Sequence, residues 1–182
     1  ILSGVGLLGG SMLRDFAIVA TAYGANFQDL KSSGAEGIFS LFLGVILSFS
    51  LGALIAIFFG YTDAISITTI GAGAVTFVVG PITGSAIGAG SEVIALSVAA
   101  GLVKSILVMT MTPLVARRIG LNNPKSAMVF GGLMGTNSGV AAGLAAVDPK
   151  LVPYGAMTAT FYTALGCLIV PSVLFFIVNL FY

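Results

Sequence analysis

Long apolar segments separated by short polar turns run along the chain, and their lengths predict membrane-spanning helices. The segment 37–60 carries no charged residue, and about 20 apolar residues rising about 1.5 Å each suffice to cross a hydrocarbon core of about 30 Å. The segment 93–116 is a second predicted span, with Lys104 at its midpoint. The segment 154–182 is a third; it is interrupted by Pro171 and ends in aromatic residues suited to a membrane interface.

A fourth apolar stretch, 1–24, carries Arg14 and Asp15 near its centre. Adjacent residues on a helix point about 100° apart, so these two side chains cannot pair well with each other. Ser11, Arg14 and Thr21 lie along one helical stripe, which would suit a polar pathway. The alternative is that the pair lies at the membrane edge as ordinary boundary charges.

Two further apolar segments, 66–91 and 126–147, are dense in Gly, Ala, Ser and Thr and are unlike ordinary spans. Pro81 favours a break in the first segment, and non-helical backbone at membrane depth survives only inside protein or beside a wet cavity. We therefore expect an all-α, polytopic membrane bundle with two glycine-rich segments that are broken or re-entrant. Glycines at four-residue spacing make a smooth packing stripe on a helix; they are Gly80, Gly84, Gly88, Gly131, Gly135, Gly139 and Gly143.

The two glycine-rich segments also resemble each other. Residues 83–90 match residues 136–143 at four of eight positions when the chain is offset by 53 residues. A true repeat is typical of transporters, in which paired interrupted segments mark the binding site. The alternative is a chance match between two segments of similar composition.

Composition excludes a water-soluble fold. Of the 182 residues, 58% are hydrophobic and 7% are charged, whereas soluble domains carry about 25% charged residues. The basic residues form no stripe that would indicate a nucleic-acid partner. Histidine is absent and cysteine occurs once, which excludes an intrachain disulfide and a thiolate metal cluster. No catalytic motif is present, so we expect no enzyme activity, no metal centre and no cofactor.

One loop predicts the orientation of the chain. Arg117, Arg118 and Lys125 lie between two apolar segments with no acidic residue nearby, and basic loops stay on the cytoplasmic side. The loop 117–125 is therefore expected to be cytoplasmic. The other loops carry mixed charges and decide little.

Lys104 is the first candidate binding residue. A lysine at the centre of a membrane helix costs about 2.5–3.5 kcal/mol to insert and usually faces the bundle interior or a water-filled cavity. As a functional residue it would attract an anionic substrate. The alternatives are an ion pair with a buried acid, such as Asp15 or Glu92, and snorkelling to the interface. Its neighbours on the same helix face are Ser97, Ala100 and Gly101, all of them small.

Two polar motifs inside the glycine-rich segments are the second candidate. Hydroxyls, an amide and free backbone N–H groups are neutral ligands for a carboxylate, and helix N-termini add positive dipole. Unwound carbonyls beside Thr83, Thr136 and Asn137 could hold Na⁺ as a coupling ion. The alternative is helix packing, which Asn137 resists best because a buried amide needs several partners. With Lys104, the expected substrate ligands are Thr83, Gly84, Ser85, Thr136, Asn137, Ser138 and Gly139.

A third polar cluster follows Pro153 and comprises residues 158–163. Thr158 and Tyr162 share a helix face at i, i+4 spacing and could line the same cavity. Structural packing is the favoured interpretation of this cluster.

Four motifs together resemble the larger membrane subunit of the bacterial malonate:sodium symporter, the MadM family. Each glycine motif alone is weak, but the combination is fairly specific, and the resemblance extends over most of the chain, from 9–15 (GGSMLRD) to Pro171. The motifs are 80–85 (GPITGS), 100–105 (AGLVKS), 131–136 (GGLMGT) and 151–162 (LVPYGAMTATFY).

The resemblance implies Na⁺-coupled import of malonate, or a similar small dicarboxylate, across the bacterial cytoplasmic membrane together with a small second membrane subunit, MadL. It also implies a longer N-terminus, so we expect the 182 residues to form one transporter domain that lacks its N-terminal helices. Two alternatives remain: a scaffold subunit whose partner carries the substrate, and a passive channel. A pure scaffold has little reason to hold both Lys104 and Asn137 at membrane depth.

Overall fold

The computed structural model describes residues 34–182, which are built of helices and short turns. The predictions for segment 1–24, including Arg14 and Asp15, lie outside these residues. The helices are α4 (Gly34–Phe58), α5 (Ala64–Val75), α6 (Val79–Ile87), α7 (Ser91–Val115), α8 (Pro124–Met134), α9 (Asn137–Ala145), a 3₁₀ turn (Pro149–Leu151), α10 (Val152–Ile169), a π-helical turn (Val170–Leu174) and α11 (Phe175–Asn179).

Within the described residues, three helical stretches are long and apolar enough to cross a membrane: Gly34–Phe58, Ser91–Val115 and Pro149–Asn179. They coincide with the three spans predicted from the sequence. Much of their apolar surface is exposed, including Leu54 and Phe58, as is expected of helices that face lipid rather than water. The prediction of an all-α membrane protein is confirmed.

Both glycine-rich segments are broken helices. The first is divided into α5, of 12 residues, and α6, of 9 residues, and the second into α8, of 11 residues, and α9, of 9 residues. A helix needs about 20 residues to cross the membrane, and each of these four helices is shorter than that. In the first segment α5 and α6 fold back on each other, since Gly73 lies against Gly80 and Thr69 lies against Gly84. We call this pair the first hairpin.

The second hairpin, α8 and α9, turns at Gly135, whose φ of +68° suits glycine. Its two arms return to the same end of the molecule, because Gly155 at the start of α10 lies against Ala127 of α8 and against Val140 and Leu144 of α9. The segment therefore enters and leaves on one side. Re-entry, one of the two forms expected from the sequence, describes both glycine-rich segments.

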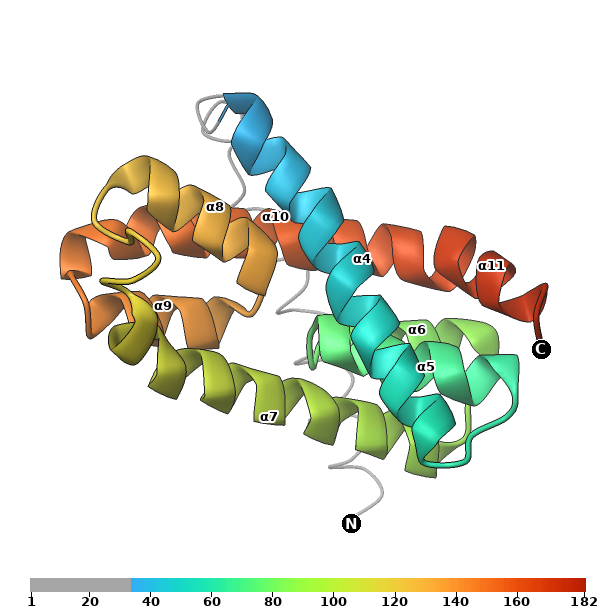
Figure 1. Cartoon of the computed structure of the whole chain (residues 1–182). Coiled ribbons are helices and arrows are strands. Elements are labelled where there is room, and N and C mark those ends of the chain that lie inside the picture. The colour runs from blue at the N-terminus through green and yellow to red at the C-terminus, as the bar shows by residue number, and fades with distance from the viewer. Residues whose placement is uncertain (1–33) are drawn as a thin grey trace, which may run out of the picture.

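The two hairpins approach from opposite ends of the molecule (Figure 1). Helices α4 and α7 run in opposite directions, so the first hairpin follows the end of α4 and the second follows the end of α7. The repeating unit is thus one long helix and one hairpin, present twice with opposite direction. Inverted repeats of this kind are common in secondary transporters, where the binding site lies at the repeat interface.

The repeat has a different register from the one predicted. Asp63 accepts a hydrogen bond from the Ser66 N–H at the start of α5, and Asn123 accepts one from the Ser126 N–H at the start of α8. These equivalent caps are 60 residues apart, not 53. The predicted match was wrong in register because it compared small-residue composition: it aligned Thr83, inside α6, with Thr136, at the break before α9.

The ends of the molecule differ in charge. One end carries Arg117, Arg118 and Lys150, together with Asp148, and there Lys125 of α8 forms an ion pair with Glu36 of α4 at 2.9 Å. This exposed pair joins the starts of two elements that are far apart in sequence. The opposite end carries Asp63, in the turn between α4 and α5, and Glu92, at the start of α7.

Glycine contacts hold the first hairpin against α7. A Cβ atom on Gly73 would overlap the backbone of Ser97, and a Cβ atom on Gly101 would overlap the backbone of Phe77 in the turn between α5 and α6. Close approach of this kind replaces the hydrophobic drive that lipid does not provide. The tip of the hairpin is therefore fixed against the middle of α7 by backbone contact.

Gly73→Ala should destabilise the protein by about 1–3 kcal/mol, because α5 and α7 cannot separate without loss of packing along both helices. Thermal unfolding in detergent would measure the effect. Gly90→Ala is the matched control: no atom lies within 4 Å of a Cβ built there. Equal melting temperatures of the two variants would contradict the close-packing account.

Candidate substrate and ion site

Lys104 lies where the first hairpin meets the long helices. Its ammonium donates hydrogen bonds to the Ser48 hydroxyl of α4 at 2.9 Å, the Val75 carbonyl at the end of α5 at 2.9 Å, and the Tyr162 hydroxyl of α10 at 3.2 Å. It also lies 5.1 Å from the centroid of the Tyr162 ring, within cation–π range. One side chain thus joins four helices in the middle of the bundle.

The position of Lys104 follows from the small residues on its own helix face. Ser97 is fully buried and contacts Gly73 and Gly80 of the first hairpin, and Gly101 is buried against Phe77. These contacts turn this face of α7 inward, as the sequence predicted. A lysine one turn further along must then project into the bundle rather than into lipid.

Among the described residues, neither an ion pair with Glu92 nor snorkelling accounts for Lys104. Glu92 lies 12 residues earlier on the same straight helix, about 18 Å away at about 1.5 Å per residue, and so cannot pair with it. Snorkelling is excluded because the ammonium is bonded to three interior oxygens. Within residues 34–182, the lysine that forms an ion pair with an acidic residue is Lys125, which pairs with Glu36. Asp15 lies outside the described residues.

Tyr162 is fully buried and links Lys104 to the second hairpin. Its hydroxyl donates to the Gly44 carbonyl at 3.1 Å while accepting from Lys104. Its ring fills the space beside Gly135, where a Cβ atom would overlap it. Thr158, which shares its helix face, donates to the Met128 carbonyl at 2.8 Å and packs α10 against α8. Packing thus describes Thr158, whereas Tyr162 belongs to the central site.

The two hairpin tips differ in how their second arms begin. Thr76 caps α6, because its hydroxyl accepts from the N–H groups of Val78 and Val79 at 3.2 and 3.1 Å. The corresponding Thr136 makes no capping bond to α9; its hydroxyl bonds instead to the Ser105 hydroxyl, next to Lys104. The first N–H groups of α9 therefore have no side-chain cap, and such groups favour an anion.

Asn137 is the first residue of α9 and reaches across to α10. Its amide nitrogen donates to the Thr160 hydroxyl at 3.2 Å. Its side-chain oxygen is buried and has no hydrogen-bond partner in the part of the chain that the structure describes. An unpaired buried oxygen is costly, so this position suits a bound cation or water. Ser138 is exposed, and Gly139 lies against the Ser105 backbone.

The expected ligands of the first segment lie elsewhere. Thr83, Gly84 and Ser85 belong to the middle and end of α6, one to two turns from the hairpin tip. Thr83 is fully buried, and its hydroxyl has no partner within residues 34–182, whereas Ser85 is exposed. Tyr162 lies against both Lys104 and Gly135 at the tip of the second hairpin. Thr136 bonds to Ser105 and Asn137 to Thr160, and the Thr83 motif lies apart from them in α6.

Sequence reasoning missed several groups of the central site. Ser105 follows Lys104 directly and so carried a usable signal, whereas Ser48 is one of three serines in its span, with Ser40 and Ser50, and the sequence does not distinguish it from them. Thr76 could have been found from its position 60 residues before Thr136. The Val75 carbonyl had no signal, because it becomes a ligand only where α5 ends.

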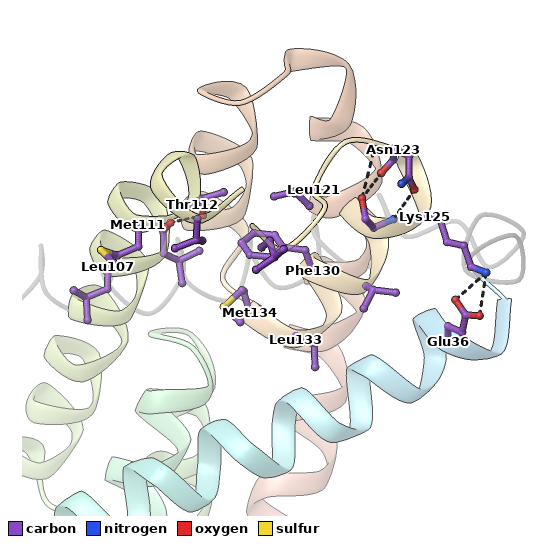
Figure 2. A pocket seen from close by; sticks show the side chains of 15 residues that line it. Glu36, Leu107, Met111, Thr112, Leu121, Asn123, Lys125, Phe130, Leu133 and Met134 are labelled. Carbon is purple, nitrogen blue, oxygen red and sulfur yellow. Dashed lines mark hydrogen bonds and ion pairs between the residues drawn. The ribbon is translucent and has the colours of Figure 1, made fainter. Parts of the chain in front are cut away.

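A separate cavity of about 780 Å³ opens between α4, α7 and α8 at the basic end (Figure 2). Its wall is mainly apolar, with Phe130, Leu133 and Met134 near the second hairpin tip. Its charged residues, Glu36 and Lys125, are exposed and bonded to each other. A bound dianion needs compensating charge or many donors, so this cavity is not a suitable anion site.

A comparison with protein-family models matches the chain over residues 1–182 to the family described as malonate/sodium symporter MadM subunit. No curated protein and no solved structure matches it. The family is one of transporter subunits, and it agrees with the multi-pass helical fold and with the inverted pair of broken helices at the bundle centre. The chain belongs to the MadM family of malonate/sodium symporter subunits.

Proposed function

We propose that this chain carries the substrate site of a Na⁺-coupled malonate importer, and that malonate binds beside Tyr162, between Lys104 and the tip of the second hairpin. The observation that carries the proposal is that Tyr162 lies against both Lys104 and Gly135, and Gly135 directly precedes the uncapped start of α9. Helix breaks at membrane depth are the usual binding sites of secondary transporters. A scaffold subunit would not require either feature.

Malonate is a dianion near neutral pH, so its site must supply positive charge and several donors. The N–H groups at the start of α9 and the Asn137 amide supply donors, with the Thr136 and Ser138 hydroxyls beside them. Gly139 allows α9 to pack closely against α7 at Ser105 and so holds this turn in place. Lys104 supplies the charge, and its field acts on the anion even though its own hydrogen bonds go to protein oxygens.

Sodium requires oxygen ligands, and the unpaired Asn137 side-chain oxygen is the best-placed one on the described residues. With the Thr136 hydroxyl it would hold Na⁺ beside the anion, so each ion would lower the cost of burying the other. The unpaired Thr83 hydroxyl in α6 is a further oxygen ligand, at a distance from the first. Gly84 and Ser85 would contribute backbone groups there rather than at the central site.

The distribution of charge supports one orientation. Arg117, Arg118, Lys125 and Lys150 lie at one end, which the preference of basic loops for the inside makes cytoplasmic. The second hairpin then enters from the cytoplasm and the first from outside. The membrane would be the bacterial cytoplasmic membrane, and the partner a small MadL-like subunit.

Vesicles containing the full-length protein and its small partner should accumulate malonate against its gradient only when Na⁺ is present outside. The measurement is uptake of radiolabelled malonate, with K⁺ replacing Na⁺ at fixed pH and membrane potential as the control. Equal uptake in the two salts would remove sodium coupling. Equilibration without accumulation would indicate a passive channel.

Asn137→Ala should lower kcat/KM for malonate uptake about 10- to 100-fold, because hydrogen bonds to charged groups contribute about 1.5–3 kcal/mol. The same variant should still insert and assemble. Asn179→Ala, at an exposed asparagine near the end of α11, is the matched control and should leave uptake unchanged. Wild-type kinetics in Asn137→Ala would favour the scaffold alternative and reduce this motif to helix packing.

A further inference from the structure

We propose that the Lys104 ammonium is a tethered cation: it permanently fills a cation site at the end of α5 and takes the place that a free coupling ion would occupy there. The comparison of Lys104 with a coupling ion rests on the proposed transport function. The site itself is defined by contacts within the described residues, without reference to malonate.

The ligand set of this site is that of a monovalent cation. Its three oxygens are the Ser48 hydroxyl, the Val75 carbonyl and the Tyr162 hydroxyl, from α4, α5 and α10. All three are neutral, and none comes from α7, which carries the lysine. Hydroxyls and the carbonyls of an interrupted helix are the groups that hold Na⁺ in transporters with broken helices.

The position at the end of α5 adds to this preference. The last carbonyls of a helix lack N–H partners within the helix and carry the negative end of its dipole. Lipid offers no donor that could satisfy them. The Val75 carbonyl therefore needs a donor or a cation, and the Lys104 ammonium supplies both.

The hydrogen bonds also limit what else Lys104 can do. An ammonium has three N–H donors, and all three are used. A malonate carboxylate could pair with Lys104 directly only after displacing one of the three oxygens and freeing the tip of the first hairpin. In this arrangement Lys104 is a positioning residue: it fixes the hairpin tip and supplies charge to the adjacent anion site.

The proposal predicts chemical rescue by a small free cation. Lys104→Ala leaves the three oxygens without a partner and removes enough volume to admit ethylammonium. Thermal unfolding of the full chain with its partner subunit, without malonate, should show a saturable rise in melting temperature with ethylammonium chloride. Wild type should show no such rise. Tetramethylammonium, which has the same charge but no N–H donor, should have no effect.

Lys125→Ala is the matched control, because it removes an exposed lysine that pairs with Glu36; ethylammonium should not stabilise it specifically. Absence of rescue in Lys104→Ala would overturn the tethered-cation proposal. Rescue that appears only with malonate present would also overturn it, because it would make Lys104 a direct substrate ligand.

An exchange of residues tests the site if Lys104→Ala does not fold. Lys104→Ser combined with Ser48→Lys supplies the ammonium from α4 instead of α7 and leaves a hydroxyl in its former place. The double variant should recover the yield and melting temperature lost in Lys104→Ser alone, and failure to recover either would overturn the proposal. These readouts need no malonate, so failure of sodium-dependent uptake in wild type would refute the proposed function separately.

Discussion

The hydrogen bond from Lys104 to the Val75 carbonyl is the contact on which the centre of this molecule depends. A helix that ends inside a membrane leaves carbonyls that lipid cannot satisfy, and a lysine inside a membrane is a charge that lipid cannot solvate. Each is costly alone, and each removes the cost of the other. Ser48 and Tyr162 complete the coordination and attach it to α4 and α10.

Glycine residues let the helix backbones approach closely enough to form this arrangement. Gly44 lies against the backbone of Gly132 and Leu133, and Gly131 lies against that of Gly155, so the second hairpin is held between α4 and α10 as the first is held against α7. A side chain at these positions would keep the helices apart and leave the breaks unsupported. The high glycine content is thus the condition that lets short half-helices stop at mid-membrane.

The sequence was informative wherever a property depended on a single helix. Freedom from charge predicted the span at 37–60, and the small face of Ser97, Ala100 and Gly101 predicted that Lys104 points inward. It was misleading where the property depended on where a helix stops. Thr83 and Thr136 look alike in a row of small residues, but one lies inside a helix and the other at a break.

The same limit applies to the binding groups. The Val75 carbonyl becomes a ligand because Lys104 lies beside it, and α9 lacks a cap because the Thr136 hydroxyl bonds to Ser105. No sequence pattern predicts either contact. The cap pair Asp63 and Asn123 is different, because it could have been found by testing other offsets. Local capping chemistry was therefore a better guide to the repeat than similarity of composition.

The apolar interior is divided in a way that bears on movement. One hydrophobic core joins α4 and the first hairpin to the second half of α10, around Val75 and Tyr162. Another joins the second half of α7 and the second hairpin to the first half of α10, around Val140 and Leu144. The two cores are joined by α10, which contributes to both, and by the close contact of α4 with α8 at Gly44. Tyr162 of this shared helix accepts a hydrogen bond from Lys104, so a movement of one core relative to the other must either bend α10 or change the contacts of this lysine.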